Sequence, residues 1–426
     1  MSEILRTMGA VLCLAMISVS GVQSAVAAEP SDTQVAMGLS MRHVLQLAVD
    51  THPSVNEARS SLRSAESQTT AAKLQFWPAP SVTTNSLSGN TATVVGLAQP
   101  LWSGGKLTSD LRYSEARELR AEEAIEGVRV NLGLRIASMV QSYLLNAGRR
   151  AAQERAIVIL ADLSQMILRR SGSEISAKSD INIVLSRQGQ AQSDLELFKA
   201  AEAAALSQLG QALGRSITAR DLALTPPTQD LPAAPYDLIS RALLANTSIH
   251  LSEIDHRLAE IDVERTKAAM WPTVSVRAEH QHGEYAGSTR PGNRLYLSMQ
   301  YSPGAGLSTL PQIEAAQQRV EGALQAIESA RRDVSDRIDS EWREGNSARR
   351  RLPALESAHI SAQAALESNR RLFVAGRRSW IDLLNSAREL TQAEVAEIEA
   401  QSILFGSYYR LALYVGARPW TPEGTL

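Results

Sequence analysis

The sequence has almost no cysteine, and this absence excludes several kinds of chemistry. The only cysteine among the 426 residues is Cys13. It lies in an apolar stretch, Met8 to Val19, that follows Arg6 and precedes Ala25-Val26-Ala27. This order of segments is typical of a cleaved signal peptide, expected over residues 1–27, although a retained helical anchor is the alternative. Once cleaved, the chain would have no disulfide, thiolate zinc site or cysteine nucleophile.

Aromatic residues, excess charge and long apolar runs are scarce as well. Aromatics make up only 4% of the chain, which favours a helix-rich protein with a thin core. The 43 basic and 45 acidic residues nearly balance, so no nucleic-acid partner is expected. No run of eighteen apolar residues follows the signal peptide, which argues against a transmembrane helix. If the chain spans a bilayer, it would have to do so with strands that close on themselves.

Motifs for catalysis and cofactor binding are missing too. We find no GxSxG, P-loop, GxGxxG or HExxH pattern, and Gly304-Ala305-Gly306 lacks the third glycine of a dinucleotide fingerprint. His280 and His282 share one face of an expected strand but lack the further ligands that a metal needs. The sequence therefore predicts a protein that is not an enzyme and has no cofactor and no metal.

What the sequence does contain is one plan repeated twice. Trp77-Pro78 recurs as Trp271-Pro272, 194 residues later. Each Trp-Pro follows an alanine-rich helical stretch and precedes two strands, a very long helix, a turn and a return helix, which indicates a tandem duplication. The predicted organisation is a first repeat over 28–214, a Pro-rich linker over 215–235, a second repeat over 236–417 and a tail over 418–426.

Each repeat is expected to begin with an interrupted helix and a pair of strands. The first helix spans Met41 to Gln75 and breaks at His52-Pro53, because proline disfavours helical geometry before it; Ser54 is the candidate cap. The second, from Tyr236 to Met270, breaks near Asn246. Period-two alternation predicts strands within about 78–102 and about 272–303.

The long helices are predicted from Lys106 to about Arg170 and from Thr309 to about Ala375, with Pro353 as a flaw in the second. The first would be on the order of 95 Å long. Apolar residues recur every seven positions at Ile313, Val320, Ile327 and Val334, which indicates a coiled-coil seam. The linker is expected to lie outside that seam.

Four strands are too few to close a bacterial barrel, so several copies would have to share one. At this point a resemblance enters, carried by Gln99-Pro100-Leu101-Trp102-Ser103-Gly104-Gly105, by Gly376-Arg377-Arg378-Ser379-Trp380-Ile381-Asp382-Leu383-Leu384 and by the duplication. The chain resembles the TolC family of outer-membrane channels. The resemblance implies a mainly α fold with a small β part, in which a long coiled-coil α-barrel continues a trimeric twelve-strand transmembrane β-barrel.

The resemblance also implies location, partners and function. The expected location is the outer membrane with an extension into the periplasm, and the expected partners are two further copies, outer-membrane lipid, a periplasmic adaptor and an inner-membrane ABC transporter. Tyr301 to Leu307 and Gly376 to Trp380 resemble type I secretion channels that export adhesins, the LapE-like group. The cargo would then be a large adhesin or RTX-like protein. A drug-efflux channel and a soluble periplasmic coiled-coil adaptor are the alternatives.

Four residues correspond to the family's periplasmic aperture. Asp382 corresponds to the first of two acidic rings, whereas Asn385 stands where the second carboxylate would be. Arg378 corresponds to an arginine that holds the closed state, and Phe373 stands where a tyrosine is common. The alternative for Asp382 is that it only stabilises the start of the return helix.

The remaining expected site residues lie at the tips of the long helices and beside the strands. Gly172 and Gly376 would let the chain reverse through left-handed geometry, and Arg377 and Ser379 would share the adaptor contact at the tips. Three tryptophans beside strand ends, Trp77, Trp102 and Trp271, would lie at a membrane interface, or would pack the junction between strands and helices.

Overall fold

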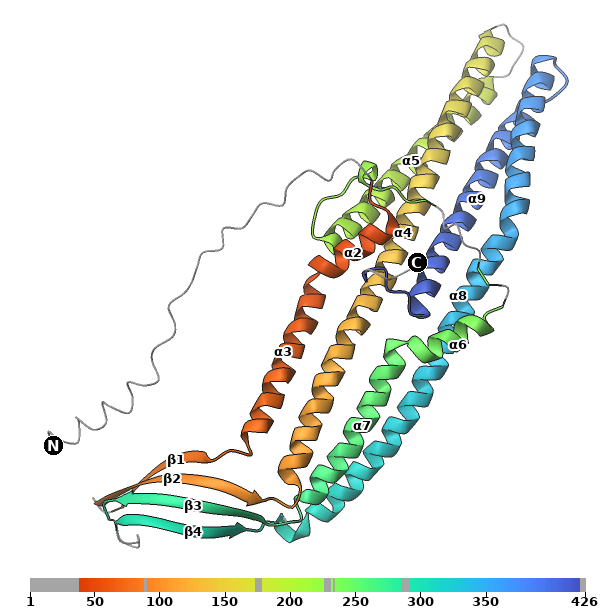
Figure 1. The fold of residues 1–426 in the computed structure, drawn as a ribbon. Coiled ribbons are helices and arrows are strands. Elements are labelled where there is room, and N and C mark those ends of the chain that lie inside the picture. The colour runs from red at the N-terminus through yellow and green to blue at the C-terminus, as the bar shows by residue number, and fades with distance from the viewer. Residues whose placement is uncertain are drawn as a thin grey trace. The chain divides into compact units, whose positions relative to one another are not determined.

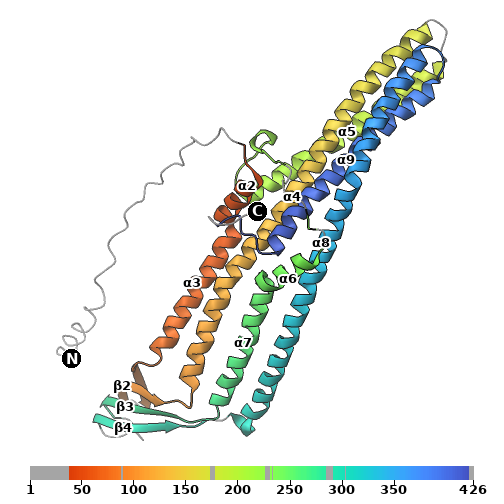
Figure 2. The same ribbon diagram turned by 45° about the vertical axis from the view of Figure 1, so that its right-hand side comes forward.

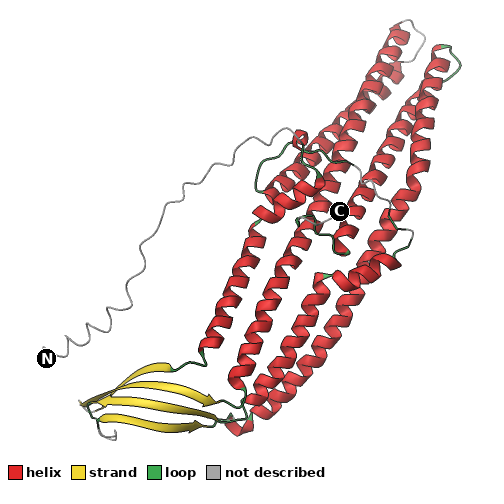
Figure 3. Ribbon diagram, viewed as in Figure 1, coloured by secondary structure: helices red, strands yellow, loops and turns green. Residues whose placement is uncertain are grey.

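Long helices make up most of the chain, and a small sheet lies at one end of them (Figure 1, Figure 3). The computed structural model describes residues 38–87, 90–172, 178–225, 231–232, 234–284, 291–302 and 304–421. All elements named below belong to one unit, Leu39–Leu426. The predicted signal peptide, residues 1–27, lies outside the described residues.

The two repeats contain the same series of elements. The first comprises α2 (Met41–Thr51), α3 (Pro53–Leu74), β1 (Ala79–Leu87), β2 (Asn90–Trp102), α4 (Lys106–Gly172) and α5 (Lys178–Leu213). The second comprises α6 (Tyr236–Ala245), α7 (Thr247–Ala268), β3 (Thr273–His282), β4 (Gly292–Gln300), α8 (Thr309–Val374) and α9 (Trp380–Tyr414). Two short 3₁₀ helices occupy Ala219–Asp221 and Ala305–Leu307. The predicted duplication and the two very long helices are confirmed.

The sheet is antiparallel with the strand order β1-β2-β3-β4. Its register places Ala79 opposite Ala98, Leu97 opposite Ala278, and Val276 opposite Leu297. The central pair, β2 and β3, comes from different repeats, so the duplication joins the two hairpins into one sheet. β1 and β4 form its two edges.

Both predicted interruptions of the first helices occur. At the first, the ring of His52 accepts a hydrogen bond from the Ser54 backbone, and Pro53 occupies the first helical position. The cap is therefore His52 rather than Ser54, which contributes its backbone N–H. Asn246 caps α7 in the same way, with its side-chain oxygen 3.0 Å from the Ser248 nitrogen.

Pro353 does not interrupt α8, which runs unbroken from Thr309 to Val374. Proline removes one backbone hydrogen-bond donor and crowds the preceding turn, which destabilises an isolated helix by about 3 kcal/mol. Contacts with α7 in the half near the sheet and with α9 in the far half support α8, so packing overrides the local preference. The helix predicted from Thr309 to about Ala375, with Pro353 as its one flaw, is therefore confirmed.

Each repeat has an equivalent apolar core around its first helix. In the first, Leu45 and Ala48 of α2 pack with Ile136 of α4 and Leu209 of α5. The second has an equivalent cluster from α6, α7, α8, α9 and the residue after α9: Leu238, Ala242, Ile249, Val334, Ile338, Leu411 and Val415. The first core also contains Phe405 and Tyr409 from α9. The last helix of the chain thus completes the cores of both repeats.

The linker contributes to these cores, contrary to the expectation that it would lie outside them. Ile217 is buried in the first core and Leu231 in the second, while the Pro232 carbonyl accepts a 2.9 Å hydrogen bond from the Trp342 ring. Apolar side chains between the prolines explain this, since they gain from burial wherever the chain passes a core. In the tail, Arg418 donates to the Thr247 hydroxyl and Trp420 to Glu126.

The helices form one layer of neighbours. In the half near the sheet, α4 packs between α3 and α7, and α7 packs against α8 (Figure 2). In the far half, α4 packs with α5 and α9, and α9 packs with α8. Among the described elements, α8 forms one edge of the layer, and α3 and α5 form the other. No helix in the described part of the chain is both long enough and apolar enough to cross a membrane.

Candidate functional site

The turn between α8 and α9 is built around Gly376, as predicted from its sequence. Gly376 has φ of 74°, a left-handed geometry that side chains disfavour. Its N–H lies 3.0 Å from the Phe373 carbonyl, and the Arg377 N–H lies 2.8 Å from the Leu372 carbonyl. These two bonds satisfy the end of α8 and reverse the chain. Gly172 is the last residue of α4, and the turn predicted to follow it lies outside the described residues.

Asp382 lies in the first turn of α9 and takes part in its cap. The Ser379 hydroxyl accepts a 3.1 Å hydrogen bond from the Asp382 backbone N–H. The Ser379 side chain is also the main cause that lowers the pKa of the Asp382 carboxyl, and Arg378, whose Nη1 lies 3.7 Å from Asp382 Oδ2, adds to it. The carboxylate remains about half exposed, so it caps the helix and still faces solvent.

Phe373 belongs to an apolar cluster at the tip instead of offering a polar link. Its ring packs on Trp380 with centroids 5.5 Å apart, and both side chains are buried. The same cluster includes Leu163 and Ile167 of α4 and Val184 of α5. The two helical hairpins are therefore joined by a shared core close to their turns.

Asn385 lies one turn beyond Asp382 and lines a groove of about 480 Å³ between α4, α5 and α9. Apolar residues such as Leu160 and Val395 form part of its wall, with Arg187 and Glu399 among the charged ones. The amide at position 385 carries no charge, so each chain has one carboxylate at the two positions predicted to line the aperture.

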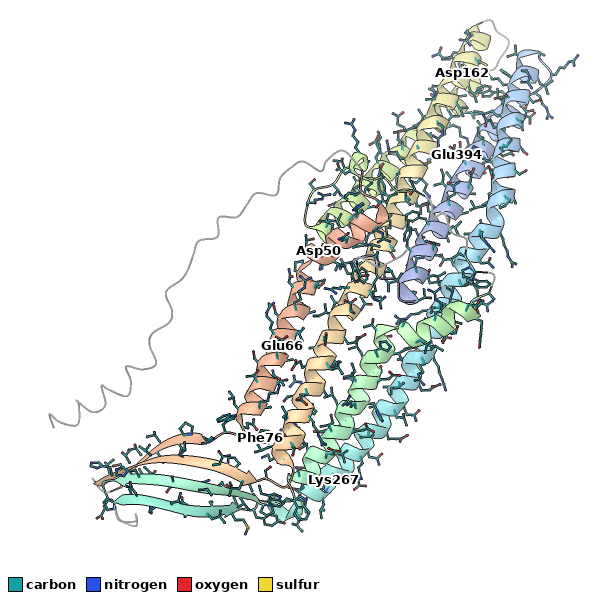
Figure 4. The ribbon with its side chains drawn as sticks, viewed as in Figure 1. Asp50, Glu66, Phe76, Asp162, Lys267 and Glu394 are labelled. Carbon is teal, nitrogen blue, oxygen red and sulfur yellow. The ribbon has the colours of Figure 1, made fainter. Side chains whose placement is uncertain are left out.

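Ion pairs between the hairpins were not predicted from the sequence. Arg370 of α8 lies 2.7 Å from Asp162 of α4, and Arg155 of α4 pairs with Glu394 of α9. Figure 4 labels Asp162 and Glu394, which come from different repeats. Charges beside the apolar seam of a coiled coil are the signal that could have indicated such pairs, although not their partners.

A buried polar network in the middle of the helices was missed entirely. Arg410 of α9 is 9% exposed, and its Nε lies 2.9 Å from both carboxylate oxygens of Glu341 in α8. Its Nη1 donates to Gln141 Oε1 of α4 at 2.6 Å. An arginine within the apolar run from Ile403 to Gly416 was the available signal, since buried arginine requires partners.

The tryptophans lie where the strands meet the helices. Trp102 and Trp271 pack edge to face with ring centroids 6.2 Å apart, and all three predicted tryptophans, including Trp77, are largely exposed. Gly104 makes this packing possible, because a Cβ there would lie 2.2 Å from the Trp271 Cβ. The junction packing is observed for two of the three, and a membrane-interface role for them stays a prediction.

The two faces of the sheet differ in character. One face presents apolar side chains to solvent, notably Leu295 (76% exposed), Leu297 (65%) and Met299 (71%) of β4. The opposite face has a polar cluster, in which the Tyr296 hydroxyl lies 2.5 Å from Glu279 Oε1 and Arg294 lies 3.5 Å from Glu279. An exposed apolar face of this kind marks a surface that is normally covered.

Comparison with known proteins agrees with this geometry. Residues 238–417 match the family model described as outer membrane efflux protein. The outer membrane efflux protein BepC of Brucella suis biovar 1 (strain 1330) is 21% identical over 405 residues, which cover 88% of this chain and 85% of BepC. The outer membrane protein TolC of Escherichia coli (strain K12) is 24% identical over 180 residues, covering 39% of this chain and 36% of TolC.

Solved structures share the fold at low sequence identity. A membrane protein from Pseudomonas aeruginosa superposes with a TM-score of 0.77 at 17% identity, covering 96% of this chain and 99% of its own. VceC from Vibrio cholerae superposes with a TM-score of 0.74 at 15% identity, covering 88% and 96%. The chain therefore has the TolC-like fold of outer-membrane channels, and its second repeat matches the outer membrane efflux family, whose members are conduits rather than enzymes.

Proposed function

We propose that this protein is the outer-membrane channel of a type I secretion system and exports a large adhesin or RTX-like protein. Three copies form a tunnel that crosses the outer membrane and the periplasm. A periplasmic adaptor recruits an inner-membrane ABC transporter to the helical tips, and that transporter supplies the energy. No nucleotide-binding motif occurs in this chain, which is consistent with a passive conduit.

The exposed apolar face of the sheet is the observation that carries the proposal. Val82, Val95 and Leu97 extend the face of Leu295, Leu297 and Met299 across all four strands, since the register places them on one side. Leaving this face in water would be costly at roughly 25 cal/mol for each Å². Contact with outer-membrane lipid removes that cost and turns the polar face, with Glu279 and Arg294, toward the pore.

The open edges of the sheet and of the helical layer support assembly from several copies. Among the strands that the structure describes, β1 and β4 each have an unpaired side, which is unfavourable in lipid. At the helical edges, apolar side chains remain exposed on both sides: Leu185 and Leu197 on α5, and Leu324 and Ile360 on α8. Two different edges that fit one another generate a closed ring, and three copies would supply twelve strands.

The tips are the proposed aperture and adaptor contact. Three copies of Asp382 around one axis would attract cations and repel one another, while Arg378 beside each carboxylate would moderate the repulsion. The half-exposed position of Asp382 is compatible with that role in addition to capping. Arg377 is exposed next to the turn and is available to an adaptor.

The choice of a protein cargo rests on the resemblance of Tyr301 to Leu307 and of the tip turn to adhesin-export channels. Efflux of small toxic molecules is the second candidate, favoured by the family model and by the name of the Brucella relative. Deletion of the gene separates the two. Secretion predicts that one large protein disappears from the cell surface and culture medium, whereas efflux predicts unchanged secretion and greater sensitivity to toxic compounds.

Reconstitution tests the channel itself. The purified full chain in a planar lipid bilayer should produce discrete ion conductance. Recovery of the protein in the soluble periplasmic fraction, without conductance in a bilayer, would contradict the proposal and favour a soluble adaptor.

A further inference from the structure

We infer that α8 of one copy packs against α3 of a second copy in the register that places Glu321 opposite Arg63. This inference rests on the proposed ring of copies and adds what that proposal lacks, namely which helices meet and at which level. It follows from the internal duplication, because one contact between the repeats is already visible within a single chain.

Equivalent core residues define how the two repeats correspond. Ala48 and Val55 occupy in the first core the places that Ala242 and Ile249 occupy in the second, an offset of 194 residues. In the long helices and the return helices the offset is 202 residues. The equivalent pairs are Leu132 and Val334, Ile136 and Ile338, and Leu209 and Leu411. On this basis α8 corresponds to α4, and α3 corresponds to α7.

Within one chain, α4 of the first repeat packs against α7 of the second. Arg112 lies 3.1 Å from Glu264, and Arg120 is held by two hydrogen bonds to Asp255, of 2.5 and 3.1 Å. Farther along, a Cβ on Gly127 would lie 3.5 Å from the Leu251 side chain. The contact therefore has a defined register, with polar pairs in one part and close packing in another.

The corresponding contact for α8 has no partner among the described residues of the same chain, because α3 lies at the opposite edge of the layer. A second copy can supply it. Transfer of the α4–α7 register predicts that Glu321 and Arg63 meet, since they correspond to Leu119 and Arg257, which line one groove between α4 and α7.

The charges of these two residues complement one another, and both are exposed. Arg63 donates to the Ser60 hydroxyl at 2.8 Å, and Glu321 accepts from Gln325 at 3.3 Å. Neither forms an ion pair with another residue in the described part of the chain. Gln325 corresponds to Glu123 and Asn56 corresponds to His250, and the Glu123 and His250 side chains are 3.4 Å apart within the chain. Gln325 of one copy would therefore lie opposite Asn56 of the next.

Disulfide cross-linking tests the register. Ser329 corresponds to Gly127 and Glu57 to Leu251, so the double variant Ser329→Cys with Glu57→Cys brings two thiols within reach between copies. The full chain with Cys13→Ser, so that no other thiol is present, is purified in detergent and mildly oxidised. Covalently linked dimers and trimers are the expected products on a non-reducing gel.

A matched control uses Ser329→Cys with Ser64→Cys, seven residues along the same face of α3. This displacement is about 10 Å, beyond the reach of a disulfide. If only the Ser64→Cys control forms linked chains, the proposed register is wrong. If the protein is oligomeric but neither cysteine pair forms a disulfide, the α8–α3 contact is wrong. Light scattering on the same samples measures their oligomeric state. A monomer would contradict the proposed ring as well as the α8–α3 contact.

Charge reversal tests the pair itself. Arg63→Glu places two carboxylates in contact and should weaken association between copies about fivefold, while Arg63→Glu combined with Glu321→Arg should restore it. Equal weakening by the single and double variants would show that Glu321 does not face Arg63.

Discussion

Removal of the Arg410 side chain should destabilise the protein more than loss of any exposed ion pair. The guanidinium joins three helices, because it contacts Glu341 of α8 and Gln141 of α4 from its position in α9. In Arg410→Ala, the Glu341 carboxylate, which is only 20% exposed, loses its cation. Loss of one partner from a buried pair costs about 3–5 kcal/mol. Partial hydration of Glu341 reduces this, so we expect about 2–3 kcal/mol.

A second substitution isolates the electrostatic part. Glu341→Gln removes the carboxylate charge while preserving its shape, so the double variant Arg410→Ala with Glu341→Gln should be less destabilised than the sum of the single variants. The coupling free energy should be on the order of 1–2 kcal/mol. A coupling near zero would mean that Arg410 acts through packing instead of charge.

Guanidinium unfolding of the detergent-solubilised full chain, followed by circular dichroism, measures these differences. Lys199→Ala is the matched control, because Lys199 pairs with Glu196 at 2.8 Å on the surface of α5, with the two side chains 45% and 67% exposed. Its expected cost is below about 0.5 kcal/mol. If Arg410→Ala costs no more than this control, the assignment of Arg410 as a buried anchor is wrong.

Three further predictions concern the tip and the sheet junction. Trp380→Ala should cost about 3–5 kcal/mol and increase hydrogen exchange at the tip, whereas Trp77→Ala, at a largely exposed position, should change neither. In the folded state the pKa of Asp382 lies below its ordinary value of 3.8. The ionised carboxylate therefore contributes its full stabilisation above that pH, and this contribution is lost as the pH falls through the lower folded-state pKa. Asp382→Asn should abolish this part of the acid sensitivity in a pH series of unfolding curves. Gly376→Ala should cost about 1–2 kcal/mol for its left-handed backbone alone, while Gly104→Ala should cost more because a Cβ also collides with Trp271; equal unfolding midpoints would contradict this.

Local patterns predicted the elements of the fold well. The breaks at His52-Pro53 and Asn246, the four strands and the start of α4 at Lys106 all follow from signals within a few residues of each feature. The left-handed turn at Gly376 is equally local. Such features depend on backbone preferences that a short segment specifies by itself.

Contacts between distant segments could not be predicted in the same way. Pro353 is locally unfavourable in a helix, yet α8 continues through it while packing against α7 and α9. Arg410 finds Gln141 across 269 positions of sequence, and no pattern near either residue indicates the other. At the tip, the resemblance pointed to Asp382 and Arg378, but the ion pair between Asp162 and Arg370 required the packed arrangement to be known.

The participation of α9 in the cores of both repeats has a consequence for the order in which the chain can fold. A ribosome produces α2, α4 and α5 long before Phe405 and Tyr409, so the first core lacks two of its aromatic side chains until synthesis is almost complete. A half-length gene product would expose the same gap permanently. Newly made chains should therefore lack a complete first core and depend on chaperones until their final helix emerges.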